Sequence, residues 1–188
     1  MHLVCLLEEP SAKELLAVVL PKVVPDAVIR FIVFEGKSDL EKNIEFRLKH
    51  WQAPDTCFLV LRDKDSGDCK RIKQGLVQKV QNSGKQGCTC VRIACHELES
   101  FYLGDLKAVE SGLSMKNLSN RQKSAKYRHP DNLANAAQEL SKLTNRRYSK
   151  ISGSRKIAPH MAVDGTNMSN SFNVLIEGVA SLVAKSHT

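Results

Sequence analysis

Long hydrophobic segments are missing from this chain of 188 residues. No apolar run approaches the roughly 18–20 residues that a membrane-spanning helix requires, so we expect no membrane segment. The opening residues, MHLVCLLEEPSA, lack a basic region, and their apolar stretch stops at Glu8. This pattern predicts a first strand rather than a secretory signal. We therefore expect a cytoplasmic protein.

Repeats, low-complexity tracts and cysteine pairs with zinc-knuckle spacing are also missing. The six cysteines lie mostly in or beside apolar runs. Without a secretion signal, they are expected to be reduced thiols rather than a disulfide framework. Cys88, Cys90, Cys95 and His96 lack the usual knuckle spacing, which argues against zinc.

Acidic residues are scarce in one stretch of a chain whose formal net charge is +8. Residues 116–156 hold eleven Lys or Arg against only two acids, Asp131 and Glu139. A local positive surplus attracts polyanions, of which nucleic acid is the commonest. The alternative interpretation is an ordinary solvated surface of a basic protein.

Apolar runs and segments of helical periodicity alternate through residues 1–110. Expected strands cover 2–7, 28–34, 57–62 and 88–95, and expected helices cover 11–24, 38–51, 68–81 and 97–109. This alternation predicts an α/β domain with a mostly parallel four-stranded sheet and right-handed crossovers. The strands lack polar alternation, as expected when helices cover both faces. Ser11 with Glu14 predicts a capping box, and Asp68 predicts a helix N-cap.

The pattern changes after residue 110. A basic loop is expected to follow, then a helix over 132–145, a loop over 152–171 and an amphipathic helix over 172–185. We therefore expect a core at 1–110 and a basic loop and helical extension at 111–188, packed on that core. The chain is long enough for one domain with such an appendage.

Acidic pairs follow three of the four expected strands. The pairs are Glu8 with Glu9, Asp63 with Asp65, and Glu97 with Glu99. The carboxyl ends of parallel strands share one edge of a sheet, where ligands bind in such folds. Carboxylates gathered there repel one another unless a hard cation such as Mg²⁺ is bound. The alternatives are a helix-dipole role for Glu9, turn acids at 63 and 65, and a solvated helical turn at 97–99.

Other acidic motifs fit less well. A calcium EF-hand loop counted from Asp63 would need Gly at Asp68 and Glu at Gln74, so it fails. A phosphate-accepting receiver domain also has acids after strands one and three. It would want a hydroxyl after strand four, where this chain has Ala94, Cys95 and His96. It is retained as a less favoured alternative.

The motifs LLEEPSA and LRDKDSGD resemble the Toprim domain of topoisomerases, primases and OLD-family nucleases. In this resemblance Glu8 matches the family's invariant glutamate, and Asp63 and Asp65 match its Asp-x-Asp pair. Glu9 and Ala12 depart from the first motif, where the family has Gly and a second acid. The fold implied is Toprim-like, that is, Rossmann-like.

The whole chain is more similar still to a small uncharacterised Toprim-like family of bacterial defence or mobile-element proteins, often encoded beside AAA or ABC-type ATPases. That likeness includes ELESFYLGD and GSRKIAPHM. It implies a metal-dependent nuclease, an anti-phage effector that works with an ATPase partner. One or two Mg²⁺ or Mn²⁺ ions would be held by Glu8, Asp63 and Asp65 with Glu97 or Glu99. Glu8 could instead act as the general acid or base.

The basic segment is expected to hold the substrate's phosphates. Candidate phosphate ligands are Arg146, Arg147, Lys150, Arg155, Lys156 and His160, with Lys156 as the candidate catalytic cation. The alternatives are a basic surface loop and a structural His160. Arg92 is expected to be a buried partner of one acid. A second hypothesis is a non-catalytic nucleic-acid or partner-binding module that keeps a structural Mg²⁺.

Overall fold

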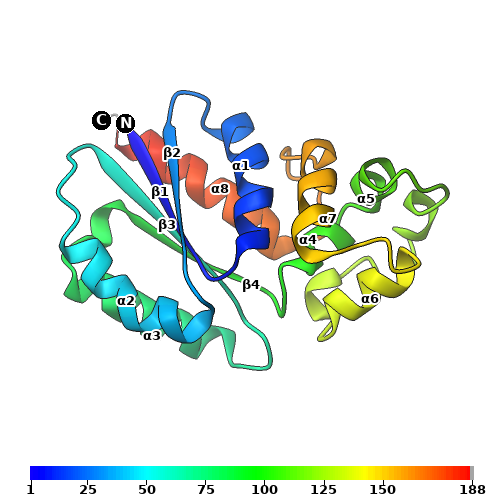
Figure 1. Ribbon diagram of the computed structural model, residues 1–188, viewed down its shortest axis with the longest axis horizontal. Helices are drawn as coiled ribbons and strands as arrows, with labels where there is room; N and C mark the ends of the chain where they lie inside the picture. The colour runs from blue at the N-terminus through cyan, green and yellow to red at the C-terminus, as the bar shows by residue number, and fades with distance from the viewer. Residues whose placement is uncertain (187–188) are drawn as a thin grey trace.

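The computed structural model, which describes residues 1–186, contains a four-stranded parallel sheet in the order β2-β1-β3-β4 (Figure 1). The strands are β1 (His2–Leu7), β2 (Val28–Val33), β3 (Thr56–Asp63) and β4 (Thr89–Ala94). Each is a short run of mainly apolar residues; β1 and β3 are buried almost throughout, as covered parallel strands require, whereas the edge strand β2 is half-buried or exposed. The α/β fold with a parallel sheet expected from the sequence is therefore confirmed.

The register brings the carboxyl ends of the four strands to one edge. Leu7 is level with Val33 of β2 and Leu61 of β3, and Asp63 is level with Ala94 of β4. Strand order reverses between β1 and β3, since β2 lies beyond β1 and β4 lies beyond β3. Ligand sites in open α/β sheets form at such a reversal.

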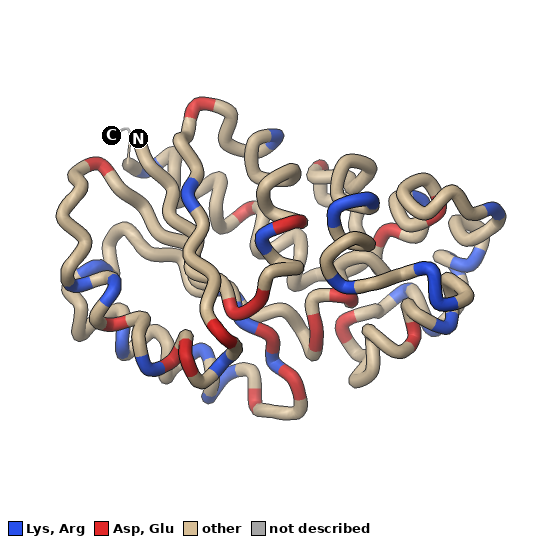
Figure 2. Tube along the Cα trace, viewed as in Figure 1, with Lys and Arg blue, Asp and Glu red and all other residues tan. Residues whose placement is uncertain are grey.

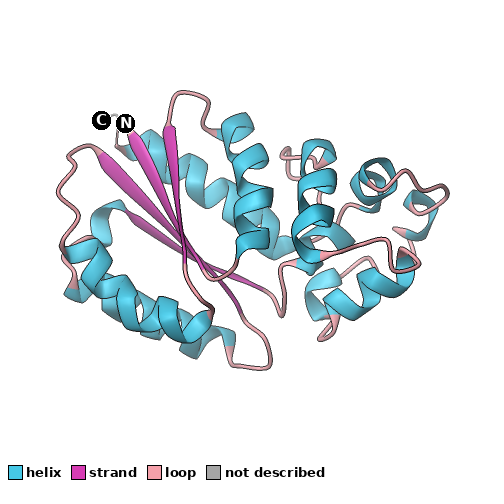
Figure 3. Cartoon of the chain, in the orientation of Figure 1, coloured by secondary structure: helices cyan, strands magenta, loops and turns pink. Residues whose placement is uncertain are grey.

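Helices cover both faces of the sheet (Figures 1 and 3). Helices α2 (Lys37–Lys49) and α3 (Cys69–Asn82) pack on one face, against side chains such as Val4 and Phe58. Helices α1 (Pro10–Val23) and α8 (Asn170–Lys185) pack on the other, against Leu3 and Leu59. Side chains alternate between faces along a strand, so apolar residues at consecutive positions supply both cores.

A second group of helices lies beyond the carboxyl edge of the sheet, at the right of Figure 1. It comprises α4 (Glu99–Leu103), α5 (Leu106–Gly112), α6 (Ala136–Leu143) and α7 (Lys150–Ile157), with 3₁₀ turns at Ser119–Arg121, Pro130–Asn132 and Ala158–His160. A further 3₁₀ turn, Gln86–Cys88, precedes β4. The helical group shares one hydrophobic core with α1 and α8. Residues after 110 thus pack on the sheet layers and also supply α8.

The expected loop over 152–171 was wrong in its first part, because residues 150–157 form α7. Gly153 and the serines beside it have low helix propensity, so the local sequence did not indicate a helix. Packing overrides propensity here: Gly153 lies against the ring of Tyr148, and Ile157 is fully buried.

Two predictions about helix ends had opposite outcomes. The capping box was wrong, because α1 begins at Pro10 with Glu9 as N-cap, and the Ser11 hydroxyl donates to Glu9. Pro is favoured at the first helical position. The Asp68 cap is confirmed, since its carboxylate accepts the Arg71 N–H at 2.7 Å.

The expected single helix over 97–109 is instead two short helices. The break falls at Gly104, where a side chain would meet Asn167 and the backbone of Ser169. Asp105 then caps α5 by accepting the Ala108 N–H at 3.0 Å. No helix within residues 1–186 is long and apolar enough to span a bilayer. All six cysteines are free thiols.

Candidate functional site

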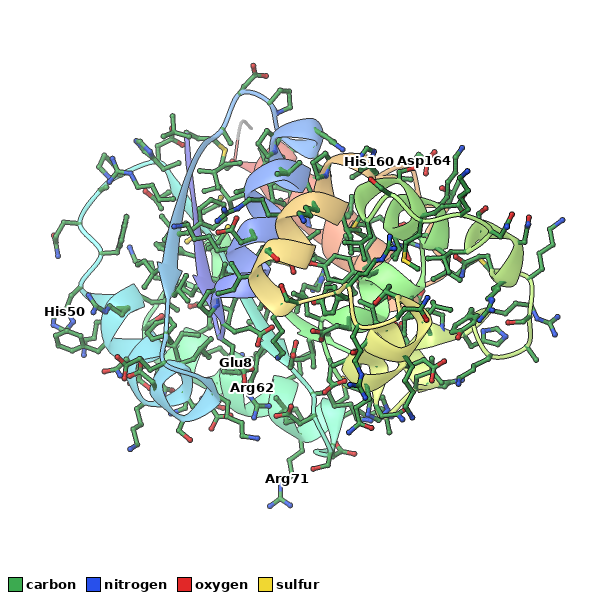
Figure 4. All side chains as sticks on the ribbon, turned by 45° about the vertical axis from the view of Figure 1, so that its right-hand side comes forward. Glu8, His50, Arg62, Arg71, His160 and Asp164 are labelled. Atoms are coloured by element: carbon green, nitrogen blue, oxygen red, sulfur yellow. The ribbon has the colours of Figure 1, made fainter. Side chains whose placement is uncertain are left out.

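The candidate site lies at the reversal of strand order, where Glu8 follows β1 and Asp63 ends β3. The Glu8 carboxylate accepts the backbone N–H of Asp63 at 3.0 Å, which fixes the two acids beside one another. Arg62 lies next to Glu8 in Figure 4. Its buried guanidinium is 3.2 Å from Glu41 of α2. The ends of β1 and β3 therefore place Glu8 and Asp63 beside each other.

Asp63 is buried at the end of β3, with 8% of its surface exposed. Burial raises its pKa well above the ordinary value, and the carboxylates of Glu9, Glu8 and Glu99 raise it further. One hydrogen bond, from the Leu98 N–H at 3.3 Å, acts in the opposite direction. Ionised Asp63 is thus costly in this environment unless a cation is nearby.

Glu8 shares this environment. Burial is the main cause that raises its pKa, and the charges of Asp65 and Glu9 add to it. The Asp63 N–H and the Arg62 charge lower it by less. Glu8 and Asp63 consequently belong to one cluster of interacting carboxylates.

Asp65 lies at the solvent side of that cluster. Its backbone is left-handed, with φ of 52°, and its N–H donates to the His96 carbonyl at 2.7 Å. Its carboxylate forms an ion pair with Lys37, the first residue of α2, at 2.8 Å. The loop after β3 is therefore fastened to the loop after β4, with the Asp65 side chain turned toward α2.

The Glu97 and Glu99 pair divides. Glu99 is fully buried, and its Oε1 accepts the Tyr148 hydroxyl at 2.9 Å. Its Oε2 is buried without a hydrogen-bond partner among the described residues. Burial raises the Glu99 pKa, while Lys150 and Tyr148 lower it by less. Glu97 instead accepts the Ala137 N–H at 2.7 Å, at the start of α6, so only Glu99 joins the cluster.

Lys150 is the basic residue that reaches these acids. Its Nζ is 2.9 Å from Glu9 Oε2, and its charge also interacts with Glu99 and Asp63. Burial by itself lowers the Lys150 pKa, but the hydrogen bond and charge of Glu9 outweigh it and raise the pKa overall. The first residue of α7 thus supplies an ammonium group to the acidic cluster.

The other candidate phosphate ligands lie outside the cluster. Arg155 forms a two-bond pair with Glu14 of α1, at 2.8 and 3.0 Å. Lys156 is exposed. His160 lines a polar hollow of about 480 Å³ with Asp164, well apart from Glu8 in Figure 4.

Lys and Arg positions occur throughout the helical part of the molecule, at the right of Figure 2. Arg146 and Arg147 are exposed in the connection between α6 and α7, a few residues before Lys150. Neither side chain forms an ion pair or hydrogen bond with another residue in the described range. Lys126, by contrast, is paired with Glu139 at 2.7 Å. The basic segment is therefore partly neutralised and partly available to a polyanion.

Three residues of the site were not predicted from the sequence, and the expected partner of a fourth residue was wrong. Lys37 comes after the second strand, so the same strand-end rule could have indicated it. Nothing in the sequence pointed to Tyr148 or Arg62 as site residues. The expectation that Arg92 pairs with an acid was wrong: it donates to the carbonyls of Val174 and Val91, both at 3.0 Å.

The oxygen donors at this edge are of the type that Mg²⁺ and Mn²⁺ prefer. The unpartnered, buried Oε2 of Glu99 is consistent with a place for a cation. Within residues 1–186, however, no three acidic, His or Cys side chains are arranged to hold a metal ion as they stand. Two carboxylates are engaged by ammonium groups, Asp65 by Lys37 and Glu9 by Lys150. A metal ion would have to compete with at least one lysine.

Comparisons with known proteins place the chain in a family. No curated protein and no solved structure matched it. One family model matches residues 7–180, nearly the whole chain, and includes the strand-end acids and Lys150. The chain belongs to this family, which is described as a domain of unknown function, DUF4276.

Proposed function

We propose that the protein is a Mg²⁺- or Mn²⁺-dependent nuclease that hydrolyses phosphodiester bonds in DNA or RNA. The observation that carries this proposal is the convergence of half-buried Glu8 with buried Asp63 and Glu99 at the reversal of strand order. Carboxylates that raise one another's pKa are costly for a fold to keep. A functional cation site is the simplest reason for keeping them.

Glu8, Asp63 and Asp65 are the proposed metal ligands, with Glu99 as a further oxygen donor. We assign Glu97 to the start of α6 rather than to the metal, since Ala137 already occupies its carboxylate. A bound ion would activate water and neutralise the phosphate that is attacked.

The chain's own residues have separate tasks in this proposal. Glu8 is held by the Asp63 N–H, which fixes its orientation toward the edge. Arg146 and Arg147 bind the backbone phosphates of the nucleic acid, as exposed arginines commonly do. Lys150, rather than Lys156, is the lysine of α7 that contacts the carboxylate cluster, through its pair with Glu9.

The biological setting is proposed on the resemblance alone. It suggests a cytoplasmic effector of anti-phage defence that works with an AAA or ABC-type ATPase. The activity test should therefore include that ATPase where one is encoded beside this chain.

The test compares Asp63→Asn with Asp68→Asn, which removes the same charge from the nearby N-cap of α3. Plasmid DNA and tRNA are incubated with each protein in Mn²⁺. Loss of an outer-shell partner costs up to about a hundredfold in activity, so loss of a ligand should cost at least that. Asp68→Asn should retain activity, because Asn is an equally good N-cap. Equal cleavage by wild type and Asp63→Asn would refute the site.

A non-catalytic binding module is the second candidate. The observation that favours it is that Lys37 and Lys150 already neutralise two of the carboxylates. Its expected signature is nucleic-acid binding that is unchanged by EDTA, with no cleavage in Mg²⁺ or Mn²⁺. A receiver domain would also carry a lysine after a fifth strand. The receiver-like alternative gains no support, since the described residues form no fifth strand.

A further inference from the structure

We infer that Lys150 occupies the place of a second metal ion, so that this site binds a single divalent ion. The inference rests on the proposed metal site and specifies how many ions it takes. It concerns the two lysines that contact the acidic cluster, one at the start of α2 and one at the start of α7.

The two lysines interact with two overlapping groups of carboxylates, which meet where Glu8 interacts with Asp63 and Glu9. In the first group, Glu8 interacts with Asp65, and Lys37 interacts with both. In the second group, Asp63 interacts with Glu9 and Glu99. Lys150 interacts with the acids of this second group. Each group therefore already contains one ammonium ion, which gives the site two places for a cation.

The backbone of Lys150 is fixed by the contacts of α7. Tyr148, just before the helix, donates to Glu99 at 2.9 Å. Arg155, farther along it, is paired with Glu14 of α1. The end of the helix packs so closely on α5 that no side chain fits at Gly112 beside Ile157. These contacts hold the start of α7 where the Lys150 side chain reaches Glu9.

The two lysines differ in their partners rather than in their own exposure. About half of each side chain is exposed, 52% for Lys37 and 53% for Lys150, but the partner of Lys37, Asp65, is 38% exposed and the partner of Lys150, Glu9, is 22% exposed. Exposed ion pairs contribute little stability. Lys150 also interacts with Glu99 and Asp63, whereas Lys37 interacts besides Asp65 with Glu8 alone among the described acids. A divalent ion should consequently displace Lys37 from the first group and leave Lys150 in the second.

The experiment counts Mn²⁺ ions bound per chain, by EPR and calorimetric titration of the full-length protein. Lys150→Met removes the charge while keeping a long side chain. Lys37→Met removes the other ammonium, and Lys156→Met is the matched control on the exposed face of α7. Circular dichroism spectra and melting curves establish that each variant is folded.

We expect one Mn²⁺ per wild-type chain and two per Lys150→Met chain. The second ion should bind the variant at least about tenfold more tightly than wild type, since one opposing charge is gone. Lys37→Met should still bind one ion, more tightly, and Lys156→Met should match wild type. Spin coupling between the two ions in Lys150→Met would show that they are neighbours.

Three outcomes separate the inference from the proposed function. Two ions in wild type, or one in Lys150→Met, would overturn the inference and leave the metal site intact. No ion bound by wild type or by either cluster variant would overturn the metal site itself. One ion in wild type and two in Lys150→Met supports both.

Discussion

The acidic edge and the basic segment contain opposite charges in opposite environments. Glu8, Asp63 and Glu99 are half-buried or buried, interact with one another, and are held by backbone N–H groups or by Tyr148. Arg146 and Arg147 are exposed in a connection between helices. Charges interact strongly where water is excluded and weakly where it is not. The difference indicates that the acids form a built site and the bases form a diffuse attractive surface.

Each region also contains one charged residue that does not behave like its neighbours. Asp68 lies in the acidic loop but acts as a helix cap, and Lys150 belongs to the basic segment but lies in the acidic cluster. Position in the fold, not charge or sequence neighbourhood, therefore separates the two kinds of residue. Each prediction below tests that separation.

The largest expected effect is on the pH dependence of stability. The folded-state pKa values of Asp63, Glu8 and Glu99 lie above their ordinary values of 3.8 and 4.5. The folded protein then binds more protons than the unfolded chain. The stability that these three groups contribute is therefore greatest below the ordinary values and is lost as pH rises through the raised values. In EDTA, the melting temperature should fall by several degrees between pH 5 and pH 7.5.

Asp63→Asn is the variant that checks this assignment. Its side chain stays neutral and can still accept the Leu98 N–H, so its melting temperature should fall less over the same range. At pH 7.5 in EDTA it should melt above wild type, whereas added Mn²⁺ should stabilise only wild type. A wild-type protein that becomes more stable from pH 5 to pH 7.5 would contradict the prediction.

A smaller loss is expected for Tyr148→Phe, which removes the hydroxyl that Glu99 accepts. A buried acceptor left unpaired costs about 1–3 kcal/mol. The matched control is Tyr102→Phe, because the Tyr102 hydroxyl is buried without a hydrogen-bond partner among the described residues. Urea denaturation should show the loss for Tyr148→Phe and little change for Tyr102→Phe. Equal losses of unfolding free energy in the two variants would mean that the Tyr148–Glu99 hydrogen bond does not explain the effect.

Asp68→Ala tests the acid that is not part of the cluster. Loss of an N-cap costs about 1 kcal/mol of the free energy of unfolding, which urea denaturation can measure. Mn²⁺ affinity should not change, because Asp68 bonds only to the start of α3. A drop in Mn²⁺ affinity would contradict this assignment and indicate that Asp68 belongs to the metal site.

The smallest effect on stability is expected for the double variant Arg146→Ser and Arg147→Ser, since both side chains are exposed and unpaired within residues 1–186. Nucleic-acid binding should nevertheless weaken. For duplex DNA, the slope of log affinity against log salt should fall in magnitude by about 1.8, or about 0.9 for each phosphate that the protein no longer neutralises. Binding titrations at several salt concentrations measure this slope, and an unchanged slope would remove these arginines from the interface.

Much of the fold could be predicted because strands and long helices carry local signals. The apolar runs placed all four strands, and strand alternation with helices indicated a parallel sheet. Asp68 was identified from its position before a helix. By contrast, α7 has Gly153 and neighbouring serines where a helical pattern would be expected, and the close packing against Tyr148 that stabilises it is not visible in local sequence.

The candidate site was predicted in outline for a topological reason. Acids that follow parallel strands share an edge, so Glu8 and Asp63 could be brought together without coordinates. Glu97 and Glu99 are two residues apart and chemically equivalent in the sequence. Only the packing of α6 and α7 sends one to Ala137 and the other to Tyr148.

The sequence by itself determined the parallel sheet, the edge at which the carboxylates gather and the surplus of positive charge after residue 115. These follow from hydrophobic periodicity and composition, which are local properties of the chain. The tertiary structure decided which acids are buried together and which lysines neutralise them. Lys150 meets Glu9 across 141 positions of sequence, and only the packing of α7 against α1 brings these two residues together.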